Sequence, residues 1–149
     1  MPLPEVPDHA IEFDAAAADW RAAVREAGAA LVRCGAATDA YTERMIGVVD
    51  EFGAYIVVAP GLALAHARPG RDVLRDAVSV VTLAEPVAFG HPHNDPVSVV
   101  IGIASVSPDT HVSLVADVAN VFNDPGALPA LQAATTADEV RAVLRGSGS

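Results

Sequence analysis

The sequence predicts an α/β sandwich, in which helices cover a sheet of buried strands. Two nearly continuous apolar runs, residues 77–83 and 97–106, carry this prediction, because strands covered on both faces lack the apolar/polar alternation of half-exposed strands. Segments with helical periodicity precede these runs, at residues 14–34 and 38–52, and follow them after residue 109. Helices on both sides of buried strands in one chain are typical of an α/β sandwich.

The first half of the chain is expected to form two helices and a strand. In residues 14–34 the apolar side chains recur at helical spacing, and Gly35 is a stop signal. A second helix is expected to begin after Thr38, a favourable N-cap residue, and to end at Gly53. Residues 55–58 are short and rich in β-branched side chains, and they therefore predict a strand that leads towards His66.

The second half is expected to form the two buried strands and three helices. The Gly, Pro, Asn and Asp content of residues 89–96 predicts a loop between the strands. Asp109 or Thr110 is expected to cap a helix that ends near Phe122, and shorter helices are expected near residues 126–134 and 136–145. No internal repeat or long linker divides the chain, so we expect one domain at residues 12–146, after a leader at 1–11 and before a disordered tail at 147–149.

Composition and charge exclude several classes of function. The chain has 149 residues, of which 52% are hydrophobic, enough for one domain with a sizeable core. Its formal net charge of -10, with only nine Lys and Arg residues, disfavours a nucleic-acid partner. It shows no membrane-spanning apolar run and no signal peptide, so we expect a cytoplasmic protein. The single cysteine, Cys34, excludes an internal disulfide and a Cys-rich metal site, and we interpret it as buried and inert.

The segment at residues 59–69 is the first candidate for chemistry. His66 follows an apolar run bounded by Pro and Gly residues, and Arg68 lies two positions further on. An imidazole among small side chains can present one ring nitrogen to a bulky reactant, and a nearby guanidinium can take up the charge of an anion. A phosphoryl group is the obvious reactant, although an ordinary half-buried histidine is the competing interpretation of His66.

The other histidines extend this hypothesis. His66, His91, His93 and His111 all lie at or beside expected strand or helix ends, where loops bring side chains together at one edge of a sheet. A pair of imidazoles suits phosphoryl relay, in which one is the nucleophile and the other donates a hydrogen bond to the phosphoryl oxygens. His91, His93 and Asp95 are alternatively candidate metal ligands, or His93 is only a solvated loop residue.

Three separated motifs, in order along the chain, resemble a known family. They are residues 59–69 (Ala-Pro-Gly-Leu-Ala-Leu-Ala-His-Ala-Arg-Pro), Phe89-Gly90-His91 with residues 94–97, and residues 100–104 followed by His111. They are similar to the enzyme IIA (EIIA) components of the bacterial phosphoenolpyruvate:sugar phosphotransferase system (PTS), mannitol/fructose-type superfamily, and look most like its ascorbate-type branch. With residues 134–140, the likeness covers about residues 12–146. It implies an EIIA type-2 domain with a mixed β-sheet flanked by helices on both sides.

The resemblance also implies the roles of the site residues. His66 matches the histidine that takes a phosphoryl group from the phosphocarrier protein HPr and passes it to a cysteine of enzyme IIB, so the protein is expected to be a phosphotransferase component with a phosphohistidine intermediate. His111 matches a second, assisting histidine, and His91 is the alternative assistant. The mannitol/fructose branch carries an arginine near the end of the second helix, where this chain has Val-Asp-Glu at residues 49–51. Arg68 is then expected to be the only nearby substitute.

The leading hypothesis is therefore phosphoryl relay that supports uptake, through a membrane permease IIC, of a sugar such as ascorbate. The runner-up is a regulatory protein of the same fold whose phosphorylation state is recognised by a partner. A metal-dependent enzyme that uses His91, His93 and Asp95 is the third alternative. The relay implies no cofactor and no metal. We also expect a flat apolar docking surface for HPr and enzyme IIB, built from the small and aliphatic residues near His66: Leu62, Ala63, Leu64 and Ala67.

Overall fold

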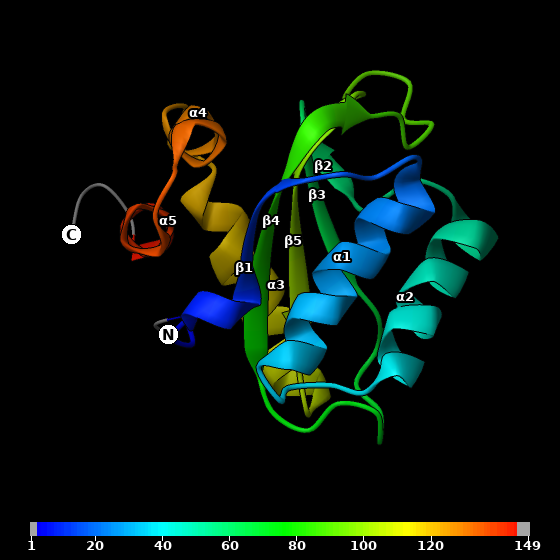
Figure 1. Ribbon diagram of the computed structural model, residues 1–149. Coiled ribbons are helices and arrows are strands. Elements are labelled where there is room, and N and C mark those ends of the chain that lie inside the picture. Colours follow the sequence, from blue (N-terminus) through cyan, green and yellow to red (C-terminus); the bar gives the residue numbers. More distant parts are fainter. Residues whose placement is uncertain (1–2, 146–149) are drawn as a thin grey trace.

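The structure is a computed structural model, and it describes residues 3–145. A five-stranded sheet lies between two layers of helices, with strands in the order β1-β4-β5-β3-β2 (Figure 1). The strands are β1 (Ile11–Ala15), β2 (Val57–Ala59), β3 (Leu62–His66), β4 (Ala77–Val87) and β5 (Val97–Ala104). The helices are the short 3-10 helix η1 (Asp8–Ala10) and α1 (Trp20–Arg33), α2 (Asp39–Phe52), α3 (Pro108–Val121), α4 (Ala127–Ala133) and α5 (Ala137–Arg145).

The sheet is mixed, as the α/β sandwich prediction and the family resemblance imply. β3 runs parallel to β5, and β1 runs parallel to β4. β4 runs antiparallel to β5, and the short edge strand β2 runs antiparallel to β3. The expected fold class is therefore confirmed.

Alternation along β3 assigns its residues to two separate hydrophobic clusters. Ala63 and Ala65 belong to a cluster with buried residues of α1 and α2, on one face of the sheet. Leu62 and Leu64 belong to a cluster with buried residues of α3, α4 and α5, on the other face. Because successive side chains of a strand point to opposite faces, His66 follows Leu62 and Leu64 and is directed to the face that α3 covers.

Cap residues explain where the helices begin and end. Thr38 precedes α2 and Gly53 follows it with a φ of 86°, so both expected ends of this helix are confirmed. The expected start of the first helix is wrong, because Asp19 caps it through a hydrogen bond from the Ala22 amide. Residues 11–15 form β1 instead. Helix α3 begins two or three residues earlier than expected, because Ser107 is the N-cap and accepts a hydrogen bond from the Thr110 amide.

The structure describes most of the N-terminal segment but not the expected C-terminal tail. Val6 and Ala10, in the segment that we interpreted as a leader, are buried in the cluster under α3, α4 and α5. The expected tail at residues 147–149 lies outside the described residues, as does residue 146. None of the helices within residues 3–145 is both long and apolar enough to cross a membrane.

The contact between α1 and α2 depends on a glycine, and this leads to a stability prediction. A Cβ on Gly28 would lie 2.2 Å from Oγ1 of the buried Thr42, whereas a Cβ on Gly47 of α2 would meet no atom within 4 Å. We expect Gly47→Ala to raise the free energy of unfolding by about 0.5–1 kcal/mol, the usual gain over glycine inside a helix. Gly28→Ala is expected to lower it, because overpacking costs about 1–3 kcal/mol.

Urea unfolding of the two variants measures both changes, and Gly47→Ala is the matched control for helix propensity. In the double variant Gly28→Ala/Thr42→Ala, the smaller residue 42 should recover most of the loss. A Gly28→Ala protein as stable as Gly47→Ala would contradict the close packing of the two helices.

Candidate functional site

His66 is the last residue of β3, and the backbone defines the state of its ring. Its Nδ1 lies 2.7 Å from the carbonyl oxygen of Leu64. A carbonyl oxygen only accepts hydrogen bonds, so Nδ1 carries the proton and donates it. In the neutral ring the lone pair is therefore on Nε2, which is the nitrogen available to attack an electrophile.

Burial keeps this imidazole neutral. It lowers the pKa of His66 below its ordinary value of 6.5, and the hydrogen bond to the Leu64 carbonyl opposes this only in part. A buried cation without a partner is costly, so the ring loses its proton more readily than in water. At neutral pH, His66 thus has the protonation state that a nucleophile needs.

His111 lies beside His66 because α3 begins at the same edge of the sheet. The two ring centroids are 5.4 Å apart, with the ring planes at 47°. Burial lowers the pKa of His111 below 6.5, and the neighbouring His66 lowers it further. Its Nδ1 is buried and has no hydrogen-bond partner within the described residues. An unpaired buried nitrogen costs about 1–3 kcal/mol, so this ring is unsatisfied in the described conformation.

Both histidines line a cavity of about 680 Å³ at this edge. Helix α2 supplies one wall, and the chain that leaves β3 supplies another. The exposed Arg68 contributes to it, as the sequence predicts. The lining residues are Arg44, Gly47, Val48, Glu51, Phe52, Tyr55, His66, Ala67, Arg68 and His111.

Arg44 is a cavity residue that the sequence analysis missed. The expectation that Arg68 is the only arginine near His66 is wrong, because Arg44 of α2 lines the same cavity. The signal was present in the helical spacing: Arg44, Val48 and Glu51 follow one another at intervals of four and three residues, so they share one face of α2. Arg44 lies five to seven residues before residues 49–51, where the family resemblance implies an arginine.

The structure does not bring His91 and His93 to this edge. His66 pairs with Ile103, near the end of β5, whereas both of these histidines lie in the loop before β5 begins at Val97. Val97 lies six residues before Ile103, and a strand rises about 3.3 Å per residue, so the loop and His66 are about 20 Å apart along the sheet. The expectation that His91 assists His66 is therefore wrong.

His91 and Asp95 shape their own loop. The His91 Nδ1 accepts hydrogen bonds from the amides of His93 and Asn94, at 3.1 and 3.0 Å. The Asp95 carboxylate accepts from three backbone amides in residues 89–91. Within residues 3–145, no group of three or more His, Cys, Asp or Glu side chains is placed to hold a metal ion. The His91 Nδ1 and the Asp95 carboxylate are thus engaged by backbone amides of their own loop.

The expected docking surface is also wrong in its residues. Leu62, Ala63, Leu64 and Ala67 are all buried, with at most 3% of any of them exposed, because β3 is covered on both faces. The exposed apolar side chains near the site come from other elements. Phe52 and Tyr55 line the cavity and are 67% and 49% exposed, and Val112, next to His111, is 70% exposed.

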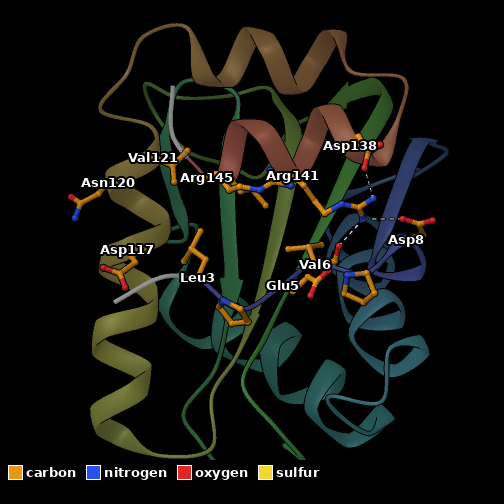
Figure 2. Close-up of a pocket in the computed structure, with 13 residues that line it drawn as sticks. Leu3, Glu5, Val6, Asp8, Asp117, Asn120, Val121, Asp138, Arg141 and Arg145 are labelled. Atoms are coloured by element: carbon orange, nitrogen blue, oxygen red, sulfur yellow. Dashed lines mark hydrogen bonds and ion pairs between the residues drawn. The ribbon is translucent and has the colours of Figure 1, made fainter. Parts of the chain in front are cut away.

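A second, larger cavity lies elsewhere and holds none of the histidines. Its volume is about 1040 Å³, and the N-terminal segment, α3 and α5 line it (Figure 2). Figure 2 shows Arg141 of α5 reaching the N-terminal segment, where it donates hydrogen bonds to the Val6 carbonyl and to Asp8. Arg141 also pairs with Asp138 on its own helix. These contacts hold the N-terminal segment against α5.

Comparison with known proteins agrees with this geometry. The family model for "Phosphoenolpyruvate-dependent sugar phosphotransferase system, EIIA 2" matches residues 6–147. The ascorbate-specific PTS system EIIA component of Escherichia coli K12 is 36% identical over 131 residues, 87% of this chain and 85% of that protein.

Two solved structures from Escherichia coli share the fold. IIA mannitol is 26% identical with a TM-score of 0.82, over 94% of this chain and 99% of that chain. Enzyme IIAMtl in complex with phosphorylated enzyme IIBMtl is 25% identical with a TM-score of 0.82, over 94% of this chain and 96% of that chain.

Proposed function

The chain belongs to the EIIA 2 family of the phosphoenolpyruvate-dependent sugar phosphotransferase system, and on that premise we propose that His66 is its phosphoryl acceptor. The observation that carries the proposal is the hydrogen bond from Nδ1 to the Leu64 carbonyl, which leaves the lone pair on Nε2. The Nε2–P bond forms as the bond from phosphorus to the phosphorylated HPr breaks. In the second step, the cysteine sulfur of enzyme IIB attacks phosphorus and the Nε2–P bond breaks.

The rest of the cavity stabilises charge during both steps. Phosphoryl transfer passes through a loose transition state, so positioning and charge stabilisation provide most of the catalysis. His111 lies beside His66 in the cavity, which places its ring to donate a hydrogen bond to a phosphoryl oxygen. Arg68 lines the cavity and supplies positive charge at its exposed side. His111 and Arg68 thus assist the transfer and do not accept the phosphoryl group.

The relatives support proposals for the partners and the sugar. One similar structure is a complex of IIAMtl with phosphorylated IIBMtl, which supports a IIB partner for this chain. We also propose that HPr is the phosphoryl donor and that the relay takes place in the cytoplasm. A permease IIC is then an indirect partner. The 36% identity to ascorbate-specific EIIA components supports ascorbate as the transported sugar. Phe52 and Tyr55, which are exposed at the cavity, provide apolar surface for docking both proteins in turn.

Incubation with phosphoenolpyruvate, enzyme I and HPr, followed by intact-mass measurement, tests this function. The protein should gain the mass of one phosphoryl group, in an acid-labile and alkali-stable bond. Addition of an ascorbate-type enzyme IIB should then remove it faster than addition of a mannitol-type enzyme IIB. Absence of any mass gain, in a mixture that phosphorylates a mannitol-type EIIA, would contradict the relay. Equal discharge to both IIB proteins would contradict ascorbate.

A further inference from the structure

Arg44 is held in a fixed orientation at the edge of the cavity. Its Nε and Nη2 donate to the two carboxylate oxygens of Asp72, at 2.7 and 2.6 Å, and Nη2 also donates to the Arg68 carbonyl at 2.8 Å. The loop that follows β3 passes so close that a Cβ on Gly70 would lie 2.8 Å from Nη2. Two planar groups joined by two parallel hydrogen bonds restrict each other's orientation more than a single contact does.

These contacts leave one side of the guanidinium unused. The guanidinium has five N–H groups, and the Asp72 and Arg68 contacts engage the one on Nε and the two on Nη2. Within residues 3–145, the two N–H groups of Nη1 have no hydrogen-bond partner, and Arg44 lines the cavity with His66 and His111. Because Asp72 occupies the Nε–Nη2 fork, the two N–H groups of Nη1 are the donors that remain for an anion bound in this cavity.

Helix α2 is fixed relative to His66 as well. The hydroxyl of Tyr41, one turn before Arg44, donates to the Ile103 carbonyl at 2.6 Å and accepts from the Ala67 amide at 3.0 Å. The Arg44 guanidinium lies over the Tyr41 ring, with Cζ 5.3 Å from its centroid. Ala67 follows His66 in the chain, and Ile103 of β5 lies opposite His66 in the sheet. The donor and the nucleophile therefore share one rigid support.

The charges of the pair support the same role. The hydrogen bonds to Asp72 raise the pKa of Arg44, and those from Arg44 lower the pKa of Asp72. Both groups therefore stay charged at any working pH, and the side chain of Asp72 is only 13% exposed. Asp72 neutralises part of the positive charge before a phosphoryl group arrives, yet the unused N–H groups remain directed donors.

We propose that Arg44 donates hydrogen bonds from Nη1 to the oxygens of the phosphoryl group on His66, and that Asp72 is the positioning residue that keeps Arg44 in place. This assignment rests on the proposed function. It gives the site a second guanidinium besides that of Arg68. The two arginines differ in kind, because Arg68 is exposed, whereas Arg44 is oriented by a carboxylate, a carbonyl and an aromatic ring.

The test measures kcat and KM for phosphoryl gain from phosphorylated HPr. Arg44→Met should lower kcat on the order of 10²-fold, the usual effect of losing a preorganised donor, and leave KM for HPr unchanged. Asp72→Asn should lower kcat less, by about tenfold, also without changing KM. The rate at which the phosphohistidine hydrolyses should also differ between Arg44→Met and the wild type. This measurement needs no partner protein. Arg25→Met is the matched control, because it breaks an exposed pair of 2.7 Å with Glu43 outside the cavity.

The outcomes separate this inference from the proposed function. If the wild type gains no phosphoryl group, the relay itself is wrong. If the wild type gains it and Arg44→Met has wild-type kcat and hydrolysis rate, the relay stands and the role of Arg44 is overturned. Should Arg44→Met fold poorly, Arg44→Lys carries the test, because it keeps the charge and the aliphatic stem. It should melt like the wild type and still lose kcat, since an ammonium group lacks the planar fork; a wild-type kcat for Arg44→Lys would overturn the proposal.

Discussion

His66→Gln is expected to take up no phosphoryl group from HPr while keeping its fold. The glutamine amide has nearly the length of the histidine side chain, and its N–H can still donate to the Leu64 carbonyl that now accepts from Nδ1. It offers no nucleophilic nitrogen, because the amide lone pair is delocalised. Intact-mass measurement after incubation with phosphoenolpyruvate, enzyme I and HPr should show the unmodified mass only, and the melting curve should match that of the wild type.

His9→Gln is the control for this variant, because His9 is exposed in η1. It should gain the phosphoryl group at the wild-type rate. A His66→Gln protein that gains it at that rate would remove His66 from the mechanism. The pH profile adds an independent check: since burial lowers the pKa of His66 below 6.5, its lone pair stays available there. The rate of phosphoryl gain should therefore fall with a midpoint below pH 6.5.

His111→Ala is expected to slow phosphoryl gain on the order of 10²–10³-fold, the usual cost of losing one preorganised donor. The ring lies 5.4 Å from that of His66 in the same cavity, so its loss removes a hydrogen bond that forms only with the phosphoryl group. The same single phosphoryl group should still appear on the protein at long times, because His66 remains. Time-resolved mass measurement distinguishes the two effects.

Two companion variants sharpen this prediction. His111→Gln keeps a donor on a side chain of similar length and should recover part of the rate. Asn120→Ala, an exposed position near the other end of α3, should leave it unchanged. Equal rates for His111→Ala and the wild type would show that His111 does not assist the transfer.

Local patterns predicted most of the fold. The limits of α2 depend on a cap residue and a glycine next to the helix, and both are visible in the sequence at Thr38 and Gly53. Strand β1 was missed because it is stabilised by a distant pairing, in which Ile11 lies opposite Val80. The alanine-rich stretch that follows it favours a helix on propensity alone, and tertiary pairing outweighs that preference.

The site was predicted only in part, because its assembly depends on strand order. His66 and His111 meet because β3 runs parallel to β5 and α3 follows β5. The sequence alone does not show that topology, so His91 in the loop at residues 89–96 was as plausible a neighbour of His66 as His111. The structure places His91 at the other edge of the sheet. Arg44 was missed for a related reason: a helical face shows which residues point together, but not which cavity they reach.

The two hydrogen bonds of the Tyr41 hydroxyl have a consequence for recognition by partner proteins. They join α2 to the residue after His66 and to the β5 residue opposite His66, inside the fold, where burial raises the pKa of the phenol to about 12. The conformational entropy of aligning His66, Arg44 and the exposed Phe52 is therefore lost once, during folding. It is not lost again each time a partner protein binds. A small, short-lived contact can then be productive, and one surface can serve a donor and an acceptor within the same cycle.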